Sequence, residues 1–190
     1  MLKKILLLLS LLSVVAASSA AAADKIYDVP EMNCTVSWPE NYTVAPVERP
    51  TDQNDELGVK VAQLAVSDPA DPTLAIHIMV ESSKLTQELP DLDYKPGAVM
   101  KDYFTEMLQN SGWQEPVVLD TLANGEMYFI KFGSYITDSA GHKYDGEIYA
   151  TVNGGKLLYL MLMSKERALK PEEKTLLQNA VGQLHFKAAV

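Results

Sequence analysis

The spacing of apolar residues divides the chain into extended and helical segments. The stretch CTVSW alternates, with Cys34, Val36 and Trp38 on one side and polar residues on the other, which is typical of a strand with one buried face. PEN follows with turn-forming residues, and YTVAPV is extended again. Residues 34–47 therefore predict a first hairpin, and residues 24–32 predict a loosely held lead-in.

Further strands are expected on both sides of a helix. LGVKVAQLAV and TLAIHIMVES are separated by SDPADP, whose prolines exclude a regular strand. The polar residues 48–56 before them predict a mobile loop. After the helix come PVVLDTL, EMYFIKFGSYI, YDGEIYATV and KLLYLMLMS. Asn124-Gly125 and Asn153-Gly154 lie between these runs and tolerate the positive φ of tight hairpin turns, so the four segments predict an antiparallel meander.

Individual faces can be assigned within this meander. In YDGEIYATV, Asp145, Glu147 and Thr151 share the polar side, opposite an apolar side that includes Ile148 and Val152. KLLYLMLMS is apolar on both sides, which is typical of a central strand covered on both faces.

The two helical segments have the 3.6-residue period. The first covers about residues 97–110, with Pro96 in its first turn, Gly112 as a left-handed stop and Trp113 able to fold back on the helix. Its predicted buried stripe is Val99, Met100, Tyr103, Phe104, Met107 and Leu108. The second begins at Pro171 and buries Leu176, Leu177, Ala180, Val181 and Leu184. An antiparallel sheet of about six to eight strands with helices packed on it is an α+β fold, expected as one domain over residues 24–190.

The N-terminal residues have the pattern of a secretory signal. Lys3 and Lys4 precede an almost entirely apolar run, Ile5 to Ala17, which is too short to cross a bilayer core of about 30 Å. Small residues follow, and cleavage is expected after Ala23. We therefore expect export to the bacterial periplasm, or otherwise secretion. The alternative is an uncleaved membrane anchor.

The net charge restricts the classes of partner that the chain can bind, and the single cysteine restricts its covalent chemistry. The full chain has 16 basic and 25 acidic residues, and loss of residues 1–23 leaves 14 basic residues and a formal charge of −11. Such a chain repels phosphate backbones and anionic lipid, so we expect no nucleic acid partner and no membrane binding after cleavage. A single cysteine cannot form an internal disulfide, and the phase of Cys34 predicts a buried, unreactive thiol.

The order of the elements resembles the PsbP-like α/β/α sandwich. This group contains the PsbP proteins of photosystem II, bacterial DcrB-type envelope proteins and a nuclear-import factor that binds the GTPase Ran. The resemblance rests on CTVSWPENYTV, AVMKDYFTEMLQNSGW, the meander from Val117 to Ser164 and PEEKTLLQNAVGQLHF. It implies a binding or assembly factor and brings no shared catalytic residues.

Two small groups of residues could support chemistry. His77 and Glu81 share one side of a strand and could act in acid–base catalysis, although the preferred interpretation of His77 is a partly buried strand histidine satisfied by a neighbour. Asp138, His142 and Asp145 in and beside a hairpin loop could bind a divalent cation, or could form a solvated hairpin tip. The methionines fall on core periods and are expected to fill gaps, with a copper-binding cluster as the alternative.

These observations favour an exported, non-catalytic binding or assembly module. No hydrolase elbow, zinc-binding helix, phosphate-binding loop or Cys-x-x-Cys occurs in the sequence, so no catalytic residue, metal or cofactor is predicted. The expected partner is an envelope protein or a small ligand, bound by a monomer or a small homo-oligomer. The alternative is a metal-binding protein or hydrolase that uses His77 with Glu81, or the Asp138–His142–Asp145 loop.

The signal prediction can be checked on the exported protein. N-terminal sequencing should give a chain beginning at Asp24 or one or two residues earlier, because signal peptidase cuts after small residues. An exported protein that still begins at Met1 would contradict the prediction.

Overall fold

Two sheets and two helices make up the described part of the chain. A computed structural model describes residues 24–47 and 58–187, and the predicted signal segment and polar loop lie outside these residues. The strands and short 3-10 helices before α1 are β1 (Asp24–Val29), η1 (Pro30–Met32), β2 (Cys34–Pro39), β3 (Thr43–Pro46), β4 (Lys60–Ser67), β5 (Leu74–Ser82) and η2 (Thr86–Glu88). The later elements are α1 (Ala98–Asn110), β6 (Gln114–Ala123), β7 (Tyr128–Thr137), β8 (Lys143–Asn153), β9 (Lys156–Lys165), α2 (Pro171–Gly182) and β10 (His185–Phe186).

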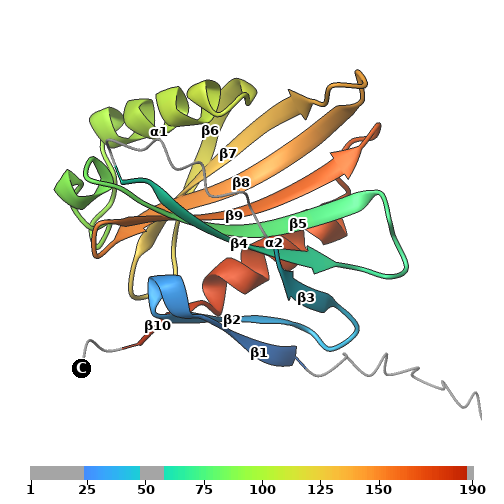
Figure 1. The fold of residues 1–190 in the computed structure, drawn as a ribbon, viewed down its shortest axis with the longest axis horizontal. Coiled ribbons are helices and arrows are strands. Elements are labelled where there is room, and N and C mark those ends of the chain that lie inside the picture. The colour runs from blue at the N-terminus through green and yellow to red at the C-terminus, as the bar shows by residue number, and fades with distance from the viewer. Residues whose placement is uncertain (1–23, 48–57, 188–190) are drawn as a thin grey trace, which may run out of the picture.

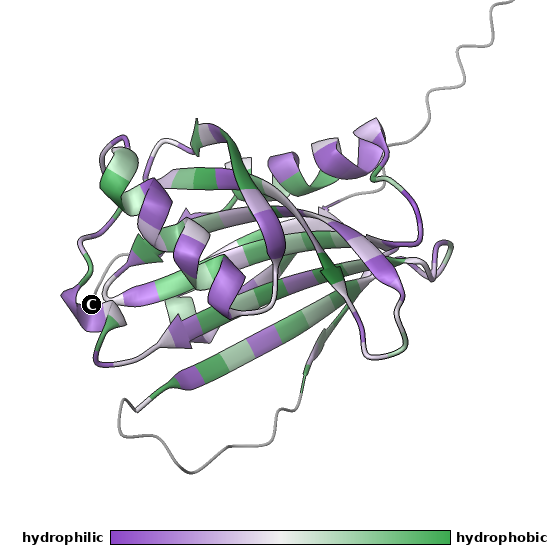
Figure 2. Ribbon diagram, turned by 90° about the horizontal axis from the view of Figure 1, so that it is seen from above, coloured by the Kyte–Doolittle hydropathy of each residue, from purple (hydrophilic) through white to green (hydrophobic). Residues whose placement is uncertain are grey.

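The larger sheet has seven antiparallel strands in the order β3-β4-β5-β9-β8-β7-β6. The predicted meander is its β6–β9 half, and β9 returns to pair with β5, so β9 is the middle strand. Its side chains from Leu157 to Leu162 are buried on both faces, as the sequence predicts. Along the strands, apolar and polar residues alternate where only one face is covered (Figure 2).

Helix α1 covers one face of this sheet, and α2 covers the other (Figure 1). The α1 stripe is buried at Met100, Phe104 and Leu108, and the Phe104 ring meets the Tyr159 ring of β9 edge-on. Val99 departs from the prediction, since it is 82% exposed and points away from the sheet. Pro96 lies just before the N-cap residue of α1, Gly97, and so precedes the first turn.

The end of α1 follows the predicted chemistry in detail. Gly112 has φ +91°, and its N–H donates to the carbonyl oxygen of Gln109. The N–H of Trp113 donates to the carbonyl oxygen of Leu108, which completes a Schellman motif. The chain thereby turns back, and the buried Trp113 ring lies directly over Gly146 of β8.

Beyond α2 lies a second sheet of three strands in the order β1-β2-β10. Helix α2 runs between this small sheet and the seven-stranded sheet (Figure 1). Cys34, Val36 and Trp38 form the inner face of β2 and are fully buried, which confirms their predicted shared phase. The two faces of the large sheet are thus both covered by helix, and the α+β sandwich prediction is confirmed.

The predicted first hairpin is wrong. β2 pairs with β1 and β10 of the small sheet, whereas β3 pairs with β4 at the edge of the large sheet. Residues 24–32, predicted as a lead-in, form β1 and η1 instead. Alternation identifies the buried face of a strand but not its partner, so PEN is a turn that crosses from one sheet to the other.

Two further local details differ from the expectation. The tight turn between β8 and β9 places Gly154 and Gly155, with φ +59° and +67°, at its centre, one residue later than predicted. On the polar side of β8, Glu147 and Thr151 are buried and have partners: Lys131 Nζ lies 3.0 Å from Oε1 of Glu147, and the hydroxyl of Thr151 donates to the carbonyl oxygen of Tyr128. Polar partners in the neighbouring strand make that burial possible.

The contact between Trp113 and Gly146 gives a stability prediction. A Cβ on Gly146 would lie 2.4 Å from the Trp113 ring, so Gly146→Ala should destabilise the fold by about 1–3 kcal/mol through overpacking. Urea unfolding at equilibrium measures the change. Gly182→Ala is the matched control, because a Cβ there meets nothing within 4 Å. Equal stability of the two variants would contradict the predicted close contact.

Candidate functional site

Two adjoining hollows lie between the small sheet and the outer strands of the large one. They have volumes of about 390 and 200 Å³ and share Glu31, Ala62 and Val80 in their walls. The other lining residues are Val29, Pro46, Val47, Lys60, Val61, Gln63, Leu64, Ile78, Ser82 and Lys156. We call this site the intersheet cleft.

The apolar floor of the intersheet cleft follows from strand register. Ala62 lies opposite Val80, and Leu64 lies opposite Ile78 and Pro46, so these side chains share one face of β3–β5. That face is the one toward α2 and the small sheet. The floor therefore consists of apolar rows that cross the strands and follow one another along them.

Strand register also makes the mouth of the cleft polar. Lys60, Ser82 and Lys156 are paired across β4, β5 and β9, and they form one row at the ends of the three strands. Lys156 Nζ donates to the backbone carbonyl oxygen of Glu31 in η1. Two ammonium groups and a hydroxyl thus stand above an apolar floor, an arrangement that can hold an anionic head group with an apolar tail.

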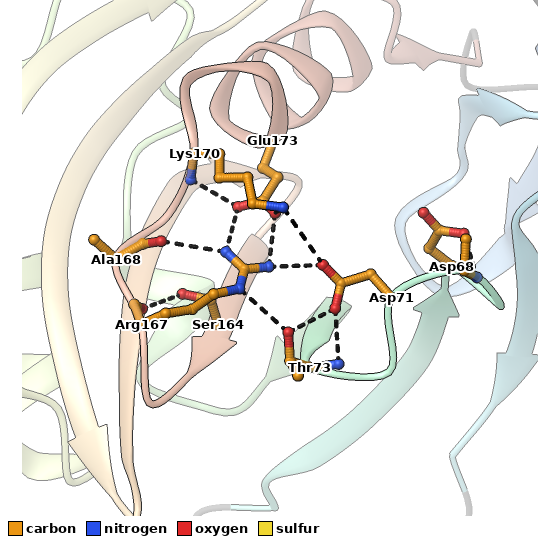
Figure 3. A network of polar contacts seen from close by, with 9 residues as sticks. Asp68, Asp71, Thr73, Ser164, Arg167, Ala168, Lys170 and Glu173 are labelled. Atoms are coloured by element: carbon orange, nitrogen blue, oxygen red, sulfur yellow. Dashed lines mark hydrogen bonds and ion pairs between the residues drawn. The ribbon is translucent and has the colours of Figure 1, made fainter.

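A separate polar network joins the start of α2 to the β4–β5 loop (Figure 3). Arg167 forms a bidentate pair with Glu173, with N–O distances of 2.9 and 2.7 Å, and its Nη2 lies 2.9 Å from Oδ2 of Asp71. Its Nε donates to the hydroxyl of Thr73. Each of these groups has a partner within the protein, so the network fastens α2 to the sheet.

Electrostatics within this network support its structural role. Burial pushes the pKa of Glu173 upward, but hydrogen bonds from Arg167 and from the backbone N–H of Lys170 lower the pKa overall. The carboxylate is therefore held charged at the N-terminus of α2, where the helix dipole favours a negative group.

The structure places His77 and Glu81 on the opposite face of the sheet from the cleft. Both side chains are half-buried, with Met79 between them on the same face of β5. Four residues of strand separate their Cα atoms by about 13 Å, too far for direct proton transfer between them. Nδ1 of His77 lies 2.6 Å from Nε2 of Gln63 in β4, and burial raises the pKa of Glu81.

The second predicted group is only partly brought together. Nδ1 of His142 lies 3.0 Å from Oδ2 of Asp138, and this hydrogen bond is the main cause that lowers the pKa of Asp138 to about 2. Oδ2 of Asp145 instead accepts the backbone N–H of Leu169, just before α2. Among the described residues, no three His, Cys, Asp or Glu side chains form a group suited to a metal ion.

Cys34 is fully buried, as predicted. Burial raises the pKa of its thiol to about 12, so very little of the reactive thiolate is present near neutral pH. Its expected resistance to thiol reagents stays a prediction.

Sequence reasoning missed the row formed by Lys60, Ser82 and Lys156. Each residue lies at the end of an extended run, which is the only local signal. The row exists because β5 pairs with β9 across the intervening helix and meander, and nothing in the separate segments indicates that pairing.

Comparison with known proteins shows similarity of fold. No protein-family model and no curated protein matches the chain. The structure of cyanobacterial PsbP (CyanoP) from Synechocystis sp. PCC 6803 is similar over 90% of this chain and 96% of its own, with 13% identity and a TM-score of 0.48. The predicted resemblance to PsbP-like proteins is thus confirmed as a likeness of fold, without any activity attached to it.

Two other solved structures are similar over most of this chain. A protein of Bacteroides thetaiotaomicron VPI-5482 is similar over 86% of it, with 12% identity and a TM-score of 0.47, and the chain spans about half (48%) of that protein. LpqN of Mycobacterium tuberculosis, involved in cell envelope biogenesis, is similar over 76% of this chain and 90% of its own, with 15% identity and a TM-score of 0.31.

No helix within residues 24–47 and 58–187 has the length and apolarity needed to cross a bilayer.

Burial of Glu81 gives a pH-dependent stability prediction. Because its pKa is raised in the folded protein, its contribution to folding stability is complete below the pKa of the unfolded chain and is lost as pH rises through the folded pKa. Glu81→Gln should therefore be more stable than the wild type at pH 7, with a smaller difference at pH 4. Urea unfolding at both pH values measures this.

Glu106→Gln, at an exposed position on α1, is the control and should change stability little at either pH. A loss of stability in Glu81→Gln at pH 7 would contradict the prediction and would point to a favourable partner for the carboxylate.

Proposed function

We propose that the protein is a non-catalytic binding module of the bacterial cell envelope that holds a small amphipathic anion in the intersheet cleft. The observation that supports this most directly is the row of Lys60, Ser82 and Lys156 above an apolar floor. The N-terminal signal pattern supports the location.

The shape of the cleft suits such a ligand. The two hollows together fall in the range of about 300–1,000 Å³ that small-molecule sites occupy. An alkyl tail would lie on the floor around Ala62 and Val80, and each buried methylene would contribute about 0.8 kcal/mol. A carboxylate or similar head would lie between the two lysines.

The charge of the protein makes the lysine pair selective. The walls of the cleft include two lysines, Lys60 and Lys156, and one acidic residue, Glu31, so the cleft is locally positive in a chain with a large excess of acidic residues. Exposed charge pairs contribute only about 0–1 kcal/mol, so the tail supplies most of the affinity and the head fixes orientation. Affinity in the micromolar to millimolar range is expected for a chain of about eight carbons.

Octanoate is a direct probe of the proposal. Titration followed by amide chemical shifts should move resonances of the cleft residues, and octylamine should bind more weakly because the lysines repel its ammonium group. Ala62→Trp should weaken octanoate binding at least tenfold by filling both hollows. Lys60→Glu should weaken octanoate and reduce its advantage over octylamine.

Each variant has a matched control. Ala65→Trp adds the same ring to the opposite face of β4, and Lys101→Glu reverses a charge on α1, which covers the other face of the sheet. Neither should alter octanoate binding. The proposal fails if octanoate leaves the cleft resonances unmoved or if Ala62→Trp binds it as the wild type does.

A further inference from the structure

The face of the large sheet opposite the cleft carries three thioether side chains around His77. His77 of β5 lies directly opposite Met161 of β9 in the antiparallel register. Met79 is two residues along β5, and Met163 is two residues along β9. Because side chains two apart point to the same face, all four belong to one surface.

Register places each of the three methionines near His77, although Met79 and Met163 lie in rows on opposite sides of the His77–Met161 pair, about 13 Å apart along the strands. Directly opposite residues have Cβ atoms about 4.5–5.5 Å apart, and diagonal neighbours are about 7–8 Å apart. Met79 stands about 7 Å along the strand from His77. The imidazole of His77 and the flexible thioethers of Met161 and Met79 can therefore converge on one ion between the two strands, with Met163 on the other side of the pair.

Helix α1 borders this group without covering all of it. The Tyr159 hydroxyl, opposite Met79 in register, donates to Sδ of Met107 on α1 at 3.8 Å. Trp113 lies over Gly146, which pairs with Met163. Met161 is 7% exposed, whereas His77, Met79 and Met163 are half-buried, so the group lies partly under the helix and partly at the surface.

A neighbour on β4 orients the histidine ring. Nε2 of the Gln63 amide lies 2.6 Å from Nδ1 of His77, and rotation of the amide by half a turn would instead place its oxygen there. In that orientation Nδ1–H donates to the amide oxygen and the lone pair of the tautomer lies on Nε2. Such an outer partner is the usual companion of a metal-binding histidine.

We propose that His77, Met79 and Met161 bind a soft monovalent metal ion, Cu(I) or its analogue Ag(I). Thioether sulfur favours Cu(I) over hard cations, and imidazole nitrogen is compatible with it. Gap filling explains Met100, which lies on the buried side of α1 in the core. It does not explain why three thioethers gather around one half-buried histidine.

Competition with a chromogenic Cu(I) chelator tests the site. Under anaerobic conditions the wild-type protein should withdraw one Cu(I) per chain from bathocuproine disulfonate, and excess Zn²⁺ should not displace it. Met79→Leu and Met161→Leu should each weaken binding at least tenfold, and His77→Gln should weaken it similarly. Leucine conserves volume, so these methionine variants should keep their fold.

Met100→Leu is the matched control, because it makes the same exchange on the buried side of α1 and should leave Cu(I) affinity unchanged. Ala62→Trp, which fills the intersheet cleft, should also leave it unchanged. X-ray absorption at the copper edge of the wild-type complex gives an independent measurement and should show sulfur ligands. The proposal is overturned if the wild-type protein fails to compete for Cu(I), or if the Met79→Leu/Met161→Leu double variant binds Cu(I) as the wild type does. It is also overturned if the copper in the wild-type complex has only nitrogen and oxygen ligands.

Discussion

Burial of β9 on both faces is the constraint on which the rest of the structure depends. Leu158, Leu160 and Leu162 point toward α2, while Leu157, Tyr159 and Met161 point toward α1, and all six are nearly inaccessible to solvent. A fully buried side chain of this size contributes about 1.5–3 kcal/mol, and β9 is the middle strand of the seven. The positions of the two helices, of the flanking strands and of both proposed sites depend on β9.

The strict alternation of strand side chains keeps the two proposed sites apart. β5 gives Val80 and Ser82 to the intersheet cleft, and it gives His77 and Met79 to the surface beside α1. The sites therefore share strands but not side chains. A slip of one residue in the β5–β9 register would exchange the two faces and would destroy both sites together.

Sequence pattern predicts the elements far better than it predicts their partners. The period of α1, its glycine stop and the apolar run of β9 are local properties, so residues 98–110 and 156–165 fold as expected. The separation of β2 from β3 and the pairing of the two-residue β10 with β2 depend on distant contacts. Exposure of Val99 shows that the width of a buried stripe is likewise set by what it packs against.

For the candidate residues too, the local pattern could be predicted and the long-range pairing could not. The shared face of His77 and Glu81 could be predicted from alternation, but the arrival of Met161 and Met163 beside His77 could not. The same holds for Lys156, which joins Ser82 only through the pairing of β5 with β9, whereas Lys60 lies opposite Ser82 across the neighbouring strands β4 and β5. Asp145 does not join the predicted loop group, and its carboxylate accepts the backbone N–H of Leu169 before α2.

The late arrival of β9 has a consequence for biosynthesis. When β5 leaves the ribosome, its inner neighbour is still roughly 70 residues from being made, a delay of about 4–15 s at ~5–20 residues per second. Until then β5 can pair only with β4, and the core between the helices cannot close. Closing so long a loop also slows folding. A chain whose core waits for one late strand therefore stays open through several seconds of its own synthesis.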